Sequence, residues 1–131
     1  MVLDTSALIA ILQGESERRA FIELLEQADS RLVSAATFVE VSIVIETRFG
    51  AEGLRDLDRF IALASIGIVP VDEEQARTAR DAFSRFGKGR HRAALNYGDC
   101  FSYALSLVRG EPLLFKGEDF RHTDVTPAVT S

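Results

Sequence analysis

The stretch Met1-Val2-Leu3-Asp4-Thr5-Ser6-Ala7-Leu8-Ile9-Ala10-Ile11-Leu12 decides how the rest of the chain is interpreted. Asp4 is the only ionisable side chain between the N-terminal methionine and Glu15. The two apolar residues before Asp4 predict a short buried strand, and the apolar run after it predicts a helix that Thr5 or Ser6 can cap. A carboxylate at the C-terminal end of a buried strand lies where open α/β sheets bind their ligands. Asp4 is therefore either a functional residue or itself the helix cap.

Length and composition predict one compact domain over residues 1–131. The chain is 47% hydrophobic and 27% charged. A chain of this size buries enough surface to fold without a disulfide or a structural metal. Cys100 is the only cysteine, which excludes an internal disulfide and a multi-cysteine zinc site. No apolar run reaches the roughly 18 residues of a membrane helix, and the N-terminus lacks the positive start of a secretory signal. We therefore expect a cytoplasmic protein with no membrane partner.

The charge is acidic in total but uneven along the chain. The sequence has 20 acidic and 15 basic residues, a net charge of −5, whereas nucleic-acid binders usually carry a basic patch. Residues 85–92 concentrate basic side chains, among them Lys88, Arg90 and Arg92. This segment is either an RNA-binding loop beside an acidic pocket or an ordinary solvated loop.

Short apolar runs alternate with longer helical patterns. Strands are predicted at 31–34, 67–71 and 112–115, with a short fifth at 124–126; helices are predicted at 16–27, 35–49, between Gly53 and Gly67, after Asp72, and at 97–108. This alternation predicts an α/β fold in which a short, mostly parallel sheet of four or five strands is flanked by helices on both faces. The helix at 35–49 is apolar almost all round, so it is either central or covered by a partner subunit, and a homodimer is expected.

Two further carboxylates stand alone in apolar segments. Glu40 is the only charged residue within 32–45, and Asp99 is the only one within 93–108. An ionised carboxylate in an apolar setting is costly unless it is paired or bound to a metal. Asp99 alone could be a helix cap. Three lone acids from three separate elements, Asp4 included, instead suggest that all converge at the C-terminal edge of the sheet.

Converging carboxylates predict a divalent-cation site. Their repulsion is relieved by a hard cation with oxygen ligands, and Mg²⁺ or Mn²⁺ suits this donor set better than zinc does. Such a site supports the attack of metal-activated water on a phosphodiester or phosphomonoester. A fourth acid could come from the polar loop 116–124, which contains Glu118, Asp119 and Asp124.

Other chemistries fit the sequence less well. A phosphatase of the dehalogenase type needs a second aspartate two residues after the first, where this chain has Ser6. A response-regulator receiver needs an acidic pair after its first strand, which is not present. A metal-free ribonuclease would have to use His91 and His122, both of which lie in hydrophilic loops.

Taken in order, these residues resemble a PIN domain, and specifically the VapC-type toxins of bacterial toxin–antitoxin pairs. The resemblance rests on residues 2–8, the helix carrying Glu40, the Gly98-Asp99-Cys100 helix start, and residues 114–120 followed by Thr123-Asp124. It implies a three-layer PIN-like fold. It also implies that Asp4, Glu40, Asp99 and Asp119 are catalytic, with Asp4, Asp99 and Asp119 as the metal ligands.

The same resemblance implies supporting residues and partners. Thr5 or Ser6 would hold the first acid through a hydroxyl, Asn96 would lie at the pocket rim, and Asp124 would support the fourth acid. The implied activity is that of a Mg²⁺- or Mn²⁺-dependent endoribonuclease that leaves a 5′-phosphate. The implied partners are RNA, a second copy of the chain and a cognate antitoxin whose C-terminal segment covers the acidic pocket. The alternatives are a non-catalytic PIN-like protein-binding module, or a DNA nuclease or phosphatase that uses the same acids.

Overall fold

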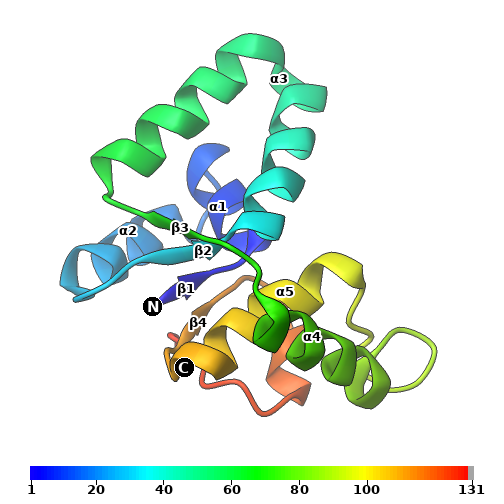
Figure 1. Ribbon diagram of the computed structural model, residues 1–131. Helices are drawn as coiled ribbons and strands as arrows, with labels where there is room; N and C mark the ends of the chain where they lie inside the picture. Colours follow the sequence, from blue (N-terminus) through cyan, green and yellow to red (C-terminus); the bar gives the residue numbers. More distant parts are fainter. Residues whose placement is uncertain (130–131) are drawn as a thin grey trace.

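Four short parallel strands form the sheet of this computed structural model, which describes residues 1–129 (Figure 1). The strands β1 (Val2–Leu3), β2 (Leu32–Ser34), β3 (Gly67–Val69) and β4 (Leu113–Leu114) lie in the order β3-β2-β1-β4. β1 is central, with Val2 opposite both Leu32 and Leu113. Because every strand runs the same way, all four C-terminal ends open at one edge of the sheet, and Asp4 follows β1 there.

Helices cover both faces of this sheet (Figure 1). They are α1 (Thr5–Leu12), α2 (Arg18–Gln27), α3 (Ala35–Leu63), α4 (Glu73–Phe86) and α5 (Tyr97–Arg109), followed by the short 3-10 helix η1 (Asp119–His122). The alternation of side chains along β1 divides the core: Val2 packs with residues of α4 and α5, whereas Leu3 packs with residues of α1, α2 and α3. The three-layer α/β architecture with helices on both faces is therefore confirmed.

The two helices predicted before and after Gly50 are the two arms of α3. Gly50 has φ +68°, a left-handed conformation that glycine adopts at little cost, and the chain reverses there. The arms form a hairpin that projects from the sheet (Figure 1). Val41 and Ile45 on the first arm are buried, but Val39 and Ile43 are 54% and 60% exposed. The first arm is thus not central, and one apolar side of it faces outward.

Several elements differ from the sequence-based prediction. β3 ends at Val69 rather than at residue 71, and β4 is limited to Leu113–Leu114 rather than 112–115. Residues 124–126 form no strand, and within residues 1–129 the backbone makes only an isolated bridge between Leu113 and Pro127 in this region. The helix predicted from residue 16 begins at Arg18. Cys100 is buried and free, as expected. None of the helices in the described part of the chain is long and apolar enough to cross a membrane.

Candidate active site

Asp4 is the helix cap of α1 as well as the carboxylate at the end of β1. Its Oδ2 accepts the Ser6 backbone N–H at 3.0 Å and the Ser6 hydroxyl at 2.7 Å, and the residue is only 3% exposed. The prediction that Thr5 or Ser6 caps this helix is wrong, because both lie inside it and Asp4 has the extended backbone of a cap. The Ser6 hydroxyl holds the first acid, as the resemblance implied for one of these two residues.

Asp4 has a second hydroxyl partner that the sequence analysis missed. The Ser102 hydroxyl of α5 donates to Asp4 Oδ1 at 2.6 Å, and Thr37 Oγ1 lies 3.2 Å from Ser102 Oγ. Both side chains are fully buried. The available signal was periodicity: Ser102 follows Asp99 by three residues and Thr37 precedes Glu40 by three, so each polar residue shares a helix face with an acid.

Glu40 is held beside the start of α5. The Thr5 hydroxyl donates to Glu40 Oε1 at 2.5 Å, so Thr5 positions the second acid rather than the first. Gly98 lies directly against this carboxylate, because a Cβ at position 98 would come within 2.6 Å of Glu40 Cδ. The close approach therefore depends on glycine at the residue before Asp99.

Asp99 lies in the first turn of α5 and belongs to a capping box. Asn96 Oδ1 accepts the Asp99 N–H at 2.9 Å, and Asp99 Oδ2 accepts the Asn96 N–H at 3.0 Å. Asn96 is thus the N-cap of α5. The cap interpretation and the functional interpretation, posed as alternatives in the sequence, both describe this residue.

The pKa of Asp99 shows that the acids influence one another. Burial is the main cause that raises the Asp99 pKa from 3.8 to about 7, and the negative charges of Asp4, Glu40 and Asp119 raise it further, against the hydrogen bond from Asn96. The four acids come from four segments, and the other three are thus near enough to Asp99 at the C-terminal edge of the sheet for their charges to act on it. Within residues 1–129, however, no three His, Cys, Asp or Glu side chains are arranged closely enough to chelate an ion directly.

Asp119 and Asp124 have different surroundings. Asp119 begins η1 and its side chain is exposed. Asp124 accepts the Tyr103 hydroxyl at 2.6 Å and lies 3.5 Å from the Arg85 guanidinium. The hydrogen bond to Asp124 adds to burial in raising the pKa of Tyr103. Asp124 therefore links the C-terminal segment to α5 and to the end of α4, and these contacts with Tyr103 and Arg85 do not involve the four acids.

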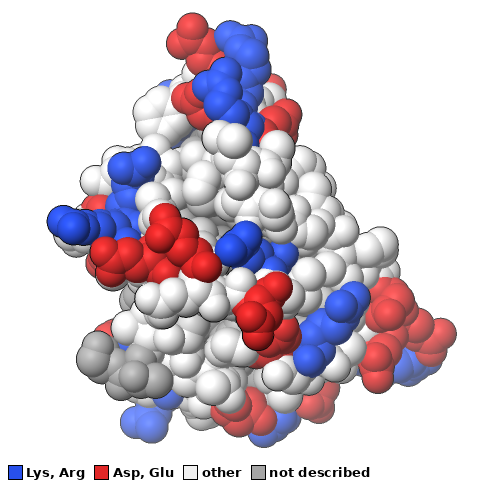
Figure 2. All heavy atoms as spheres, turned by 90° about the vertical axis from the view of Figure 1, so that its left-hand side faces the viewer, with Lys and Arg blue, Asp and Glu red and all other residues white. Residues whose placement is uncertain are grey.

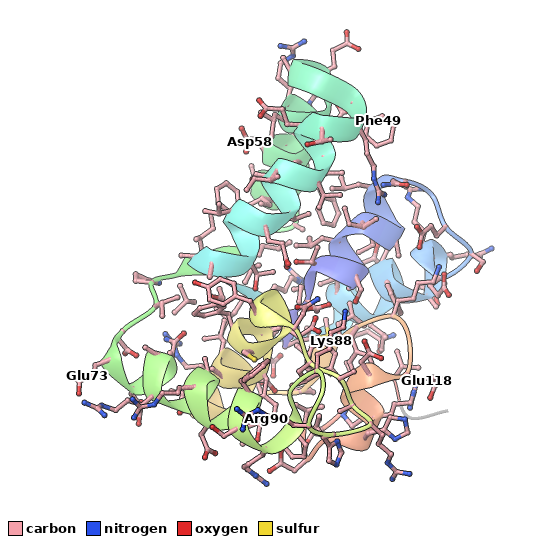
Figure 3. All side chains as sticks on the ribbon, turned by 90° about the vertical axis from the view of Figure 1, so that its right-hand side faces the viewer. Phe49, Asp58, Glu73, Lys88, Arg90 and Glu118 are labelled. Carbon is pink, nitrogen blue, oxygen red and sulfur yellow. The ribbon has the colours of Figure 1, made fainter. Side chains whose placement is uncertain are left out.

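The loop between α4 and α5 carries basic residues. Lys88, Arg90 and Arg92 are exposed on the loop between α4 and α5, which is closed by the hydrogen bond from the Lys88 N–H to the Leu95 carbonyl. Figure 3 faces the side of the molecule where α5 begins and shows Lys88 and Arg90 on this loop. On the opposite side, Figure 2 shows acidic and basic side chains interspersed.

The contacts of Lys116, which directly follows Phe115 after β4, could not be predicted from the sequence. Its Nζ lies 2.7 Å from Glu15 and 3.3 Å from Glu17, and these contacts raise the Lys116 pKa. Its backbone N–H donates to Ser6 Oγ at 3.0 Å. Lys116 therefore links the segment after β4 to the loop between α1 and α2.

The family model of the PIN domain matches residues 1–125, and the chain belongs to the PIN domain family. Its sequence is 57% identical to Ribonuclease VapC of Mycolicibacterium smegmatis over 129 residues, which cover 95% of this chain and 97% of that relative.

Solved structures agree with this fold. VapC20 of Mycobacterium tuberculosis, described as a sarcin-ricin loop cleaving toxin, superposes with a TM-score of 0.76 at 14% identity over 95% of each chain. A chain of a toxin–antitoxin complex from Klebsiella pneumoniae superposes with a TM-score of 0.70 at 18% identity, covering 99% of this chain and 95% of that one. At such low identities the two structures show the fold alone.

Proposed function

We propose that this chain is an endoribonuclease toxin of a toxin–antitoxin pair that hydrolyses RNA phosphodiester bonds with the help of a divalent cation. The observation that carries the proposal is the meeting of Asp4, Glu40 and Asp99 at one edge of the sheet in a chain so similar to a ribonuclease VapC. We further propose that residues 1–131 act as a single nuclease domain.

The donor set fits Mg²⁺ or Mn²⁺. VapC-type PIN ribonucleases are metal-dependent in general, and the carboxylates gathered here offer only oxygen atoms. We assign Asp4, Asp99 and Asp119 as ligands; because they do not close into a direct chelate, water molecules would complete the coordination, as Mg²⁺ prefers. When bound, the cation lowers the pKa of its water and neutralises charge on the scissile phosphate.

The protein residues set up this chemistry. Asp99, with a pKa of about 7, is protonated in about half of the molecules at neutral pH, and positive charge nearby would favour its ionised form. Thr5 and the contact with Gly98 hold Glu40 facing the start of α5, where it can orient the attacking water. Lys88, Arg90 and Arg92, which are exposed on the loop between α4 and α5, would bind the RNA backbone.

Two protein partners are part of the proposal. The acid cluster would bind an arginine from the C-terminal segment of a cognate antitoxin, since an arginine can replace the cation as the source of positive charge. The exposed apolar side chains of α3 and α5, with Tyr97 79% exposed, would be covered by a second copy of the chain.

Cleavage of a short RNA by the purified chain tests the function. We expect cutting with Mg²⁺ or Mn²⁺, none with a chelator, and products with 5′-phosphate ends. Asp4→Asn should lower the rate by about 10²-fold or more while the chain stays folded, because it removes a charged ligand. Asp58→Asn, an equal charge change on the exposed second arm of α3, is the control.

The outcomes separate the alternatives. Cleavage of DNA but not RNA, or of phosphomonoesters alone, would contradict a ribonuclease. No cleavage of any substrate, together with antitoxin binding that survives in Asp4→Asn, would favour a non-catalytic binding module. Growth arrest on expression that depends on Asp99 would support the toxin.

A further inference from the structure

Both oxygens of the Asp4 carboxylate are tied to hydroxyl groups inside the protein. Oδ2 accepts the N–H and the hydroxyl of Ser6, and Oδ1 accepts the hydroxyl of Ser102 at 2.6 Å. The two hydroxyls approach from different elements, because Ser6 lies on α1 and Ser102 on α5. The carboxylate is therefore fixed on both sides rather than free to rotate.

The hydroxyl protons can be assigned by counting. A serine has one hydroxyl proton, and Ser102 gives its proton to Asp4, so in the 3.2 Å contact Thr37 must be the donor to Ser102. The Thr37–Ser102 relay thus runs from the Thr37 hydroxyl through the Ser102 hydroxyl to Asp4 Oδ1. A parallel chain runs from the Lys116 N–H through the Ser6 hydroxyl to Oδ2.

The same count leaves one site on Asp4 for a ligand. Each carboxylate oxygen has two lone pairs. Both pairs of Oδ2 are used by Ser6, whereas Oδ1 uses one pair for Ser102 and keeps one. An ion that reaches Asp4 can therefore bind only through Oδ1.

We propose that the Thr37–Ser102 relay is a positioning device that makes Asp4 a one-oxygen ligand, through Oδ1, of the divalent cation. This inference rests on the proposed function, since it concerns how that site holds its metal. Single-oxygen coordination suits the strict octahedron of Mg²⁺, whereas Ca²⁺ readily takes a carboxylate through both oxygens. Partners that orient a ligand in this way typically change metal affinity by 10- to 100-fold.

Ser106 provides a matched control on the same helix. It is also buried, one turn beyond Ser102, and its hydroxyl donates to the Glu111 carbonyl at 2.6 Å. Ser106→Ala and Ser102→Ala each remove one buried hydroxyl of α5 and one hydrogen bond of 2.6 Å, and Ser102→Ala also removes the acceptor of the Thr37 hydroxyl. A purely structural role for Ser102 would leave the Mn²⁺ affinity unchanged in both folded variants.

The test is Mn²⁺ affinity, measured on the full chain by calorimetry and by the electron paramagnetic resonance of free Mn²⁺. We expect Ser102→Ala to bind Mn²⁺ about tenfold more weakly than the unmodified chain, and Ser106→Ala to bind it equally well. Thr37→Val, which removes the relay's donor, should weaken binding, and Thr37→Ser, which keeps the hydroxyl, should restore it. Thermal unfolding without metal compares the stability of all four variants.

Equal Mn²⁺ affinity in Ser102→Ala and Ser106→Ala would overturn the inference. If Ser102→Ala does not fold, Thr37→Val decides in its place, and unchanged affinity there would overturn it as well. Asp4→Asn separates this inference from the proposed site. Loss of Mn²⁺ binding in Asp4→Asn with no effect of Ser102→Ala refutes the relay alone, whereas unchanged binding in Asp4→Asn refutes the metal site itself.

Discussion

Asp99 combines two tasks that oppose one another energetically. As part of the capping box with Asn96, its carboxylate is stabilised by a backbone N–H at the start of α5. As a member of the acid cluster, it is destabilised as an anion by burial and by three negative neighbours. The pKa of about 7 shows that the second effect exceeds the first.

Metal-free stability should therefore depend on pH through Asp99. Between 3.8 and about 7 the folded chain keeps a proton that the unfolded chain has released, so the free energy of unfolding falls as pH rises through this range. Asp99→Asn keeps a capping oxygen without the charge, and should be more stable than the unmodified chain by about 2 kcal/mol at about pH 8, after allowance for solvent screening. The advantage should disappear near about pH 4.

Chemical denaturation across this pH range, with a chelator present, measures the effect. Asp58→Asn is the control for a carboxylate on the exposed surface. If Asp99→Asn were less stable than the unmodified chain at every pH, the capping role would dominate and the charge repulsion inferred here would be wrong.

Gly98 supports a second prediction at the scale of a single residue. Alanine is favoured over glycine in helices by up to about 1 kcal/mol, so helix propensity alone predicts that Gly98→Ala stabilises α5. A Cβ at this position would instead overlap the Glu40 carboxylate and displace it. We expect RNA cleavage to fall by about 10²-fold with little change in melting temperature.

A remote crowded glycine controls for general strain. Gly53 on α3 would place its Cβ 2.7 Å from Phe49 Cβ, far along the hairpin from the acids. Gly53→Ala should lower stability while the folded fraction keeps its activity. Full activity in Gly98→Ala would show that Glu40 does not need its present position.

Among the elements, the loop between α4 and α5 carries positively charged side chains just before the start of α5. Arg85 lies in the last turn of α4, before the loop, and pairs with Asp124. Within the loop, Arg90 lies over the Phe83 ring of α4 at 5.5 Å, so the loop contacts α4 there. Lys88 and Arg92 are exposed on the same loop. The RNA-binding role of this loop stays a prediction.

Neutralising this loop should weaken RNA binding and reduce its salt dependence. The triple variant Lys88→Gln, Arg90→Gln, Arg92→Gln, in an Asp99→Asn background that prevents cleavage, should lose up to about two units of slope in log affinity against log salt. The control triple Arg48→Gln, Arg55→Gln, Arg59→Gln changes net charge equally on the α3 hairpin. Equal losses in both triples would mean that only the total charge matters.

At the scale of the whole molecule, exposed apolar side chains of α3 and α5 form a surface that the proposed metal chemistry does not explain. Val39 and Ile43 of α3 lie near Tyr97 of α5, and the groove between them is lined by Phe101 and Glu40 as well. An apolar surface beside a charged site is typical of a protein interface. Its residues come from two elements far apart in the sequence, so only the folded chain presents it.

Sedimentation at high micromolar concentration should show a dimer. Ile43→Lys should convert it to a monomer, because a charge would be buried in the interface. Leu63→Lys, at an apolar residue at the end of α3 that is even more exposed than Ile43, should leave the dimer intact. A monomeric unmodified chain would show that the homodimer prediction is wrong.

The sequence alone determined the order of the elements and the family. The PIN resemblance is confirmed by the family model, and β1, β2 and α5 lie where local patterns predicted. These features are local, because burial periodicity, caps and lone charges can be recognised within a few neighbouring residues. The roles assigned to the acids, and the RNA-binding role of the basic loop, stay predictions.

Only the tertiary structure decided which groups meet. Thr5 contacts Glu40 rather than Asp4, Asp124 binds Tyr103, and the Thr37–Ser102 relay reaches Asp4. It also placed Gly98 against Glu40 and exposed one side of the first arm of α3. The physical reason is that a hydrogen bond between residues 98 positions apart depends on how helices pack across the sheet, and no local preference of either segment specifies that geometry.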